Sequence, residues 1–193
     1  QGSVAHTAVI PVGGNNFTHD VAMGLRTTQM SAENLKRKYG CALAELVPAE
    51  EAIEVEAVGG RKSRSLPRRE LCEVIEARAE ETLQLLRTEL SKMDFFKKIG
   101  SGLILTGGVS LLPGLVEMGD FIFDVPVRKG APDRVGGLTD VVRCASFATG
   151  VGLVLYGLRQ EKHKATEVAV AVKTNVSFAD VTRKIKDYFV SVF

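Results

Sequence analysis

The chain has 193 residues, of which 45% are hydrophobic and 25% charged, a composition typical of a globular protein with one or two packed domains. Its net charge of +2 argues against nucleic-acid binding, which requires a strongly basic surface. The three cysteines and three histidines are scattered, without the spacing of a zinc site, a disulfide framework or a Cys/His catalytic pair. Because no apolar run reaches the length of about 18 residues that spans a membrane, and no secretory signal opens the chain, we expect a cytoplasmic protein.

The first forty residues predict a strand followed by two helices. Residues 4–12 alternate between apolar and polar side chains, as a strand does, and end at two glycines. A short helix is predicted over 18–25, and a second helix begins at the N-cap candidate Ser31 and ends at Gly40. Because the chain does not begin with Met, we expect a fragment whose residues 1–3 are a tag remnant or part of a hairpin.

The next part of the chain, residues 41–94, predicts a small sheet covered by a long helix. The stretches 42–47 and 53–58 alternate, which indicates strands with one solvated face. A helix over 69–93 carries apolar residues at helical spacing among Glu and Arg, and it can cover the other face. We therefore predict an inserted lobe.

The pattern of a larger lobe resumes after residue 94. Residues 99–105 predict a buried strand that breaks at Gly107 and Gly108. These glycines indicate either a plain tight turn or a place where backbone can approach a ligand because no Cβ intervenes. A helix, a short edge strand and a second helix rich in small residues follow at 113–119, 125–128 and 147–157. Strands interleaved with helices predict an α/β or α+β class with one interruption.

The end of the chain predicts a linker and an amphipathic helix. Residues 164–177 favour a linker, although the alternating valines over 168–172 could instead add a strand to this chain or to a neighbour. Residues 178–193 carry basic residues on one face, a pattern that suits a membrane surface or packing on the protein's own core. The apolar face consists of Phe178, Val181, Ile185, Tyr188, Phe189 and Val192. Its position beyond a linker favours a weak, reversible membrane anchor that acts through multivalency.

Several short motifs follow one another along residues 4–158. The first are His6 to Gly14, Gly24 to Thr27 and Ala32 to Gly40. The later ones are Leu105 to Gly108, Leu112 to Gly114, Pro126 to Arg128, Val135 to Asp140 and Ala148 to Leu153. Their order resembles that of the FtsA family of actin-like bacterial cell division proteins, and this collinearity is what makes the resemblance specific.

The resemblance implies an α/β fold, an actin-like (ribonuclease H-like) ATPase lobe with an inserted smaller α+β subdomain. The larger subdomain would comprise residues 1–40 and 95–163, and the smaller one residues 41–94. In this superfamily the nucleotide lies between two lobes, and the phosphate-binding loops and the carboxylates that hold magnesium belong to the half that is absent here. We therefore expect ATP as cofactor, with Mg²⁺ in the complete protein, and neither tight binding nor hydrolysis of ATP by this chain alone. Whether the complete protein is an enzyme stays open.

The resemblance also implies that this chain carries the adenine and ribose side of the nucleotide site. The glycines after the predicted strand would present backbone to the base, and the glutamate and lysine of the second helix would meet ribose and base. The arginine beside them would stack its guanidinium on adenine. The alternative for this helix is a solvated charged face. The residues implied are Glu33, Lys36, Arg37, Gly107, Gly108, Gly13 and Gly14.

In proteins of the FtsA family, the smaller lobe binds the C-terminal tail of the tubulin-like protein FtsZ. Arg68 and Arg78 stand at the implied positions, and arginines suit a tail that carries acidic and apolar residues. The alternative for both arginines is intrahelical pairing with neighbouring glutamates. In the family a terminal amphipathic helix anchors the protein to the inner membrane, in agreement with the pattern of residues 178–193.

These expectations combine into one function. The chain would belong to a cell division adaptor that binds ATP, polymerises into actin-like filaments and tethers FtsZ to the inner face of the cytoplasmic membrane at the division site. No nucleic acid is expected as a partner. The alternatives are an actin-like protein of pilus assembly and an ATPase of the chaperone or sugar kinase type.

Overall fold

The structure is a computed structural model that describes residues 4–59, 62–92, 99–133, 136 and 142–175. The chain divides into two compact units, Gln1–Ala148 and Thr149–Phe193. Residues 41–94, expected as an inserted lobe, lie within the first unit. The second unit begins before residue 163, the expected end of the larger subdomain, and the subdomain boundaries themselves stay a prediction.

Two helices follow the N-terminal segment, α1 (Gly14–Gly24) and α2 (Gln29–Tyr39). The N-cap of α2 is Thr28, whose hydroxyl accepts a hydrogen bond from the Ser31 amide at 3.2 Å, so the predicted cap is three residues too late. The strand predicted over 4–12 is wrong, since residues 4–10 form no strand. A strand needs a neighbour to pair its backbone groups, and an alternating sequence cannot supply one by itself.

A β-hairpin leads directly into the longest helix of the first unit. Strands β1 (Ala52–Val55) and β2 (Arg64–Pro67) pair antiparallel, and α3 (Arg68–Ser91) begins at the next residue. The strand predicted over 42–47 is wrong, because this stretch contains a 3-10 turn, η1 (Ala44–Leu46). Ala44 and Val47 are both buried, which fits the three-residue period of such a turn and not the two-residue period of a strand.

The segment after α3 contributes a second, parallel pair of strands. β3 (Leu103–Leu105) pairs with β4 (Val127–Lys129), and between them lie a 3-10 turn, η3 (Gly108–Leu111), and helix α4 (Leu115–Phe123). A further turn, η4 (Ala145–Phe147), precedes α6 (Ala148–Asn175). The edge strand and both helices of the sequence prediction are therefore present.

Helix α6 corrects the alternative of an added strand over 168–172, since its backbone is helical as far as Asn175, and the linker over 164–177 stays a prediction. No glycine or proline occurs between Gly157 and that residue, and the Glu, Lys and Ala residues there favour a helix over the β-preference of the valines. Within the described residues, no helix has the length and apolar character needed to cross a membrane. The predicted amphipathic helix, residues 178–193, lies outside the described residues.

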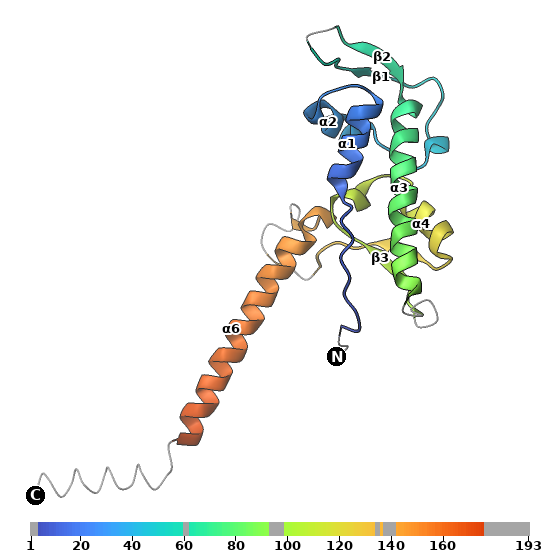
Figure 1. The fold of residues 1–193 in the computed structure, drawn as a ribbon. Coiled ribbons are helices and arrows are strands. Elements are labelled where there is room, and N and C mark those ends of the chain that lie inside the picture. Colours follow the sequence, from blue (N-terminus) through green and yellow to red (C-terminus); the bar gives the residue numbers. More distant parts are fainter. Residues whose placement is uncertain (1–3, 60–61, 93–98, 134–135, 137–141, 176–193) are drawn as a thin grey trace, which may run out of the picture. The chain divides into compact units, whose positions relative to one another are not determined.

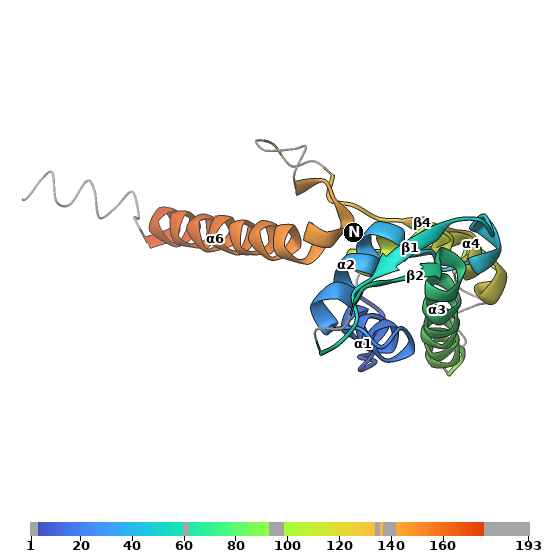
Figure 2. The same cartoon turned by 90° about the horizontal axis from the view of Figure 1, so that it is seen from above.

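Helix α3 lies at the centre of the hydrophobic core of the first unit. Its residues Leu71, Ile75, Ala79 and Leu83 recur every four positions and are almost completely buried. They join Phe17 and Val21 of α1 and the apolar face of α4 in one cluster. Figure 1 shows α1 alongside α3, and Figure 2 shows α1 next to α2 and α3 next to α4. One core therefore connects residues 41–94 to the segments on both sides.

Candidate functional site

A hollow of about 500 Å³ lies where the start of α1, the exposed side of α2 and the turn after β3 meet. We call it the α2 hollow. Five of the residues predicted to bind nucleotide line it, namely Gly14, Glu33, Lys36, Arg37 and Gly108. The remaining two, Gly13 and Gly107, line an adjoining apolar cavity of about 320 Å³ that shares Gly14 and Gly108 with the hollow.

Part of the lining of this hollow was not among the residues that the sequence indicated. The missed residues are Asn15, Gly40, Val109, Leu111, Leu112, Pro113 and Ser146. Asn15 and Val109 directly follow predicted glycines, and Gly40, Leu112 and Pro113 stand within the motifs that carry the family resemblance, so their place in the chain was a usable signal. Ser146 has no such signal, because only the approach of η4 to η3 brings it to the hollow.

A glycine turn forms one wall of the α2 hollow. Gly107 has a φ of 92°, a conformation that side chains rarely allow, and its amide donates to the carbonyl of Ala145 at 3.1 Å. A Cβ on Gly108 would have only the Ser146 hydroxyl near it, at 3.8 Å. The wall is therefore backbone with open space in front of it, which suits close approach by a flat ligand.

The opposite wall contains a buried lysine that is bonded within the protein. The Lys36 ammonium donates to the Gly14 carbonyl at 3.0 Å and to the Thr18 hydroxyl at 2.8 Å, and it pairs with Glu33 Oε2 at 2.6 Å. Lys36 is only 8% exposed. These contacts join α2 to the first turns of α1.

Two charged groups of α2 remain open to the hollow. Burial opposes the ionised form of Glu33, but hydrogen bonds from Lys36 and Thr18 and the charges of Lys36 and Arg37 outweigh it and lower the pKa of this carboxyl. Both of its hydrogen bonds use Oε2. Arg37 is exposed and forms no hydrogen bond or ion pair with the described residues. The hollow thus combines an ionised carboxylate, an accessible guanidinium and exposed backbone.

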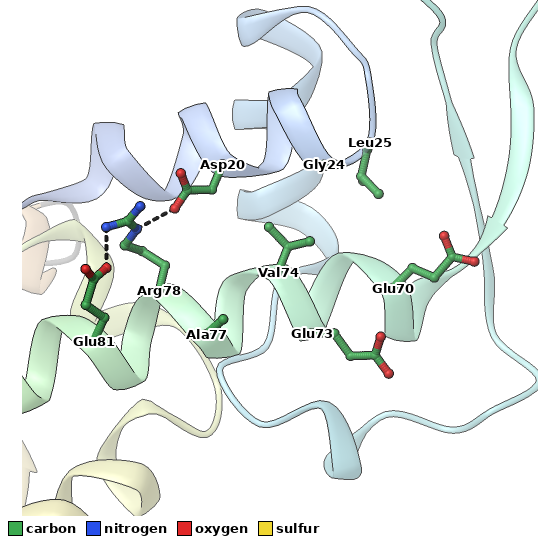
Figure 3. A pocket seen from close by; sticks show the side chains of 9 residues that line it. All are labelled: Asp20, Gly24, Leu25, Glu70, Glu73, Val74, Ala77, Arg78 and Glu81. Carbon is green, nitrogen blue, oxygen red and sulfur yellow. Dashed lines mark hydrogen bonds and ion pairs between the residues drawn. The ribbon is translucent and has the colours of Figure 1, made fainter.

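A second hollow, of about 670 Å³, lies between α1 and α3. We call it the α1–α3 groove. Figure 3 shows Asp20, Arg78 and Glu81 together at one end of it, Glu70 and Glu73 toward the other, and Val74 between them. Gly24 lets α1 approach α3 closely at this groove, since a Cβ there would lie 3.1 Å from the Val74 methyl.

Arg78, one of the two predicted FtsZ-binding residues, lines this groove. Its guanidinium bonds both Asp20 on α1 and Glu81 on α3, and the bond to Asp20 is the main cause of the raised pKa of this arginine. The pair with Glu81 is the intrahelical alternative considered above, whereas the pair with Asp20 connects two helices.

The other predicted residue, Arg68, lies at a different place, the junction of β2 and α3. Its Nε donates to the Tyr39 carbonyl at 2.8 Å, and its Nη1 pairs with Glu51 at 2.5 Å. Arg68 does not line the α1–α3 groove, so the structure does not bring the two arginines to one site.

The remaining predicted residues can be placed only in the sequence. The membrane-binding residues Phe178, Val181, Ile185, Tyr188, Phe189 and Val192 lie outside the described residues. Among the residues that are described, no group of three or more His, Cys, Asp or Glu side chains could hold a metal ion.

Comparison with known proteins identifies relatives over most of the chain. The model of the family "Cell division protein FtsA" matches residues 1–152. FtsA of Pseudomonas aeruginosa is 47% identical over 161 residues, which are 83% of this chain and 39% of that protein. FtsA of Escherichia coli K12 is 36% identical over 194 residues, 97% of this chain and 46% of that protein. The chain therefore spans less than half the length of these relatives.

Solved structures of similar fold include two of another actin-like protein. The crystal structure of MreB5 of Spiroplasma citri bound to ADP has a TM-score of 0.51 and 20% identity, over 74% of this chain and 44% of that one. The structure of the same protein bound to AMPPNP also has a TM-score of 0.51, over 80% and 47%. At this identity the likeness concerns the fold alone. The matched family and these neighbours together show that this chain belongs to the FtsA family of cell division proteins and has an actin-like α/β fold.

Proposed function

We propose that this chain is the part of a cell division adaptor that supplies the adenine and ribose side of an ATP site and a docking groove for the FtsZ tail. The complete protein polymerises and tethers FtsZ filaments to the inner face of the cytoplasmic membrane. Polymerisation makes many weak membrane helices, residues 178–193, act together, so that the attachment is firm although each helix binds weakly. Membership of the FtsA family favours this function over pilus assembly and over a chaperone or sugar kinase activity.

One observation carries the proposal for nucleotide binding. Residues predicted from three separate motifs, around Gly14, around Glu33 and around Gly108, line a single hollow of about 500 Å³. A solvated charged helix face, the alternative for α2, does not require the glycine turns to lie opposite it. Their convergence supports a binding site.

The chemistry of the α2 hollow fits the nonphosphate half of ATP. Arg37 is exposed and free to stack on a base, and the Gly108 backbone gives a surface without side chains for its other face. Oε1 of Glu33 is available to accept hydrogen bonds from ribose hydroxyls, since Oε2 takes the internal ones. The triphosphate and Mg²⁺ would be held by the half of the protein that this chain lacks.

A titration with ATP tests this part of the proposal. Amide signals of Gly14 and Gly108 are followed by NMR in the wild-type chain, in Arg37→Ala and in Lys38→Ala. Lys38 is the matched control, because it is an exposed cation on the same helix that does not line the hollow. We expect saturable shifts that weaken about tenfold in Arg37→Ala, the value of one stacked cation, and stay unchanged in Lys38→Ala. If ATP affinity falls equally in both variants, the loss reflects only the lower positive charge of the chain, and this result would contradict a specific site in the hollow.

The α1–α3 groove supports the proposal for the FtsZ tail. It offers the guanidinium of Arg78 beside apolar surface from Leu25, Val74 and Ala77, which suits a tail with both acidic and apolar residues. Since Arg78 is already held by Asp20 and Glu81, an acidic residue of the tail would share or replace one of these carboxylates.

Binding of a labelled FtsZ C-terminal peptide tests the groove. Arg78→Met removes the cation of the groove, and Arg87→Met makes the same change at an exposed position of α3 outside it. We expect the affinity to fall about tenfold in Arg78→Met only, as for one charge-assisted hydrogen bond. Thermal unfolding of both variants shows whether the fold is kept. A peptide that binds folded Arg78→Met as well as wild type would move the docking site away from this groove.

A further inference from the structure

The contacts of Lys36 leave it no hydrogen for a ligand. An ammonium group has three N–H donors, and those of Lys36 match three acceptors inside the protein, the Gly14 carbonyl, the Thr18 hydroxyl and Glu33 Oε2. The lysine is also 8% exposed. A nucleotide in the α2 hollow would have to break one of these contacts in order to bond Lys36.

Thr18 completes a closed network with Lys36 and Glu33. Its hydroxyl accepts from Lys36 and carries a single proton, which it can donate either to Glu33 Oε2 at 2.5 Å or to the Gly14 carbonyl at 3.1 Å. The ionised carboxylate is both the nearer and the stronger acceptor, so the proton goes to Glu33. Thr18 is 6% exposed, so this arrangement is shielded from water on the side of α1.

The network fixes one oxygen of Glu33 and leaves the other free. Both internal hydrogen bonds end on Oε2, and Oε1 has no hydrogen bond among the described residues. A glutamate side chain on a helix surface normally samples several rotamers, and ordering it costs conformational entropy. Here a bond from Thr18 on α1 and a bond from Lys36 on the same helix order it in advance, while 41% of the side chain stays exposed toward the hollow.

We propose that Thr18 and Lys36 are positioning residues, which hold the Glu33 carboxylate so that its free oxygen accepts hydrogen bonds from the ribose hydroxyls, and that Lys36 does not itself contact the nucleotide. This inference rests on the proposed ATP site and assigns roles within it. It revises the expectation that Glu33 and Lys36 both meet the ligand. Thr18 was absent from the residues that the sequence indicated, and it gains its role only through the fold.

Comparing ATP with 2′,3′-dideoxyATP separates positioning of Glu33 from a general structural role. The chain variants are Thr18→Val, which keeps the shape of the side chain but lacks the hydroxyl, and Thr18→Ser, which keeps the hydroxyl. Thr88→Val is the matched control, since Thr88 bonds only a backbone carbonyl of α3 on an exposed surface. Affinities for both nucleotides are measured by NMR titration, and thermal unfolding checks the fold of each variant.

We expect Thr18→Val to weaken ATP binding about tenfold, the effect of one misplaced charge-assisted hydrogen bond, and to leave binding of 2′,3′-dideoxyATP unchanged. Thr18→Ser should restore the preference for ATP, and Thr88→Val should not alter it. Equal weakening of both nucleotides in Thr18→Val, or a preference for ATP that survives in this variant, would overturn the inference and leave the proposed ATP site standing. A wild-type chain that binds neither nucleotide, or does not distinguish them, would overturn the proposed ribose contact together with the inference.

Discussion

Replacing Gly108 by alanine should separate ligand binding from folding in this chain. The backbone of Gly108 does not have a positive φ, and its added Cβ would meet only the Ser146 hydroxyl at an ordinary contact distance of 3.8 Å. Gly→Ala at a compatible position stabilises a protein by about 0.4–1 kcal/mol, because the unfolded chain loses freedom. Gly108→Ala should therefore fold at least as well as wild type.

The same methyl group would stand in the α2 hollow, against the surface expected to contact the base. Forcing an extra methyl group into a packed contact costs about 1–3 kcal/mol, which weakens binding by about tenfold or more. Gly107→Ala provides the contrasting variant. Its φ of 92° is strained for alanine although the space around it is open, so it should lose about 1–3 kcal/mol of folding free energy.

Urea unfolding measures the folding free energy of both variants, and ATP titration measures their affinity for ATP independently. The expected pattern is a stable Gly108→Ala protein with weak ATP binding and a destabilised Gly107→Ala protein. If Gly108→Ala binds ATP as tightly as wild type, no base lies against this turn, and the orientation assigned to the nucleotide is wrong.

Three further results are expected. Gly102→Ala should be destabilised by about 2–4 kcal/mol in urea unfolding, because its positive φ is strained for alanine and its Cβ would lie 2.1 Å from the Pro126 carbonyl oxygen. Gly100→Ala is the control, and it should match the stability of wild type because no atom of the described residues lies near its Cβ. The lowered pKa of Glu33 should stabilise the fold fully above the ordinary value of 4.5 and lose this contribution as the pH falls below it, so wild type and Glu33→Gln should converge in urea midpoint at acid pH. Deleting 178–193 should abolish sedimentation of the chain with vesicles of anionic lipid, and retained sedimentation would exclude the terminal segment as the anchor.

Local patterns predicted the helices well and the strands less well. Helix α3 was found over nearly its full length, because buried residues at a regular helical spacing need no information from elsewhere in the chain. The segments 4–12 and 42–47 carry strand-like alternation, yet neither is a strand. Pairing depends on a neighbour that can lie far away in the sequence. In 42–47, the burial of Ala44 and Val47 follows the period of a 3-10 turn instead.

The α2 hollow was predictable in its residues but not in its internal bonding. The order of the motifs indicated Glu33, Lys36 and Gly108 as nucleotide-binding residues, and these three residues line one hollow. Sequence position could not show that Lys36 is bonded internally, since its acceptors come from α1, as many as 22 residues away. For the same reason Arg68 and Arg78, ten positions apart on one helix, looked equivalent although they bond to different elements.

Helix α1 has a thermodynamic consequence for the two ligands proposed here. Within its eleven residues, Gly14 lines the α2 hollow, whereas Asp20 and Gly24 line the α1–α3 groove. A ligand that shifts this helix from one side also changes the binding site on the other. The coupling free energy is then reciprocal: whatever factor ATP applies to the affinity for the tail, the tail must apply to the affinity for ATP. Measuring one of these factors fixes the other, and unequal factors would mean that one of the two ligands also binds elsewhere.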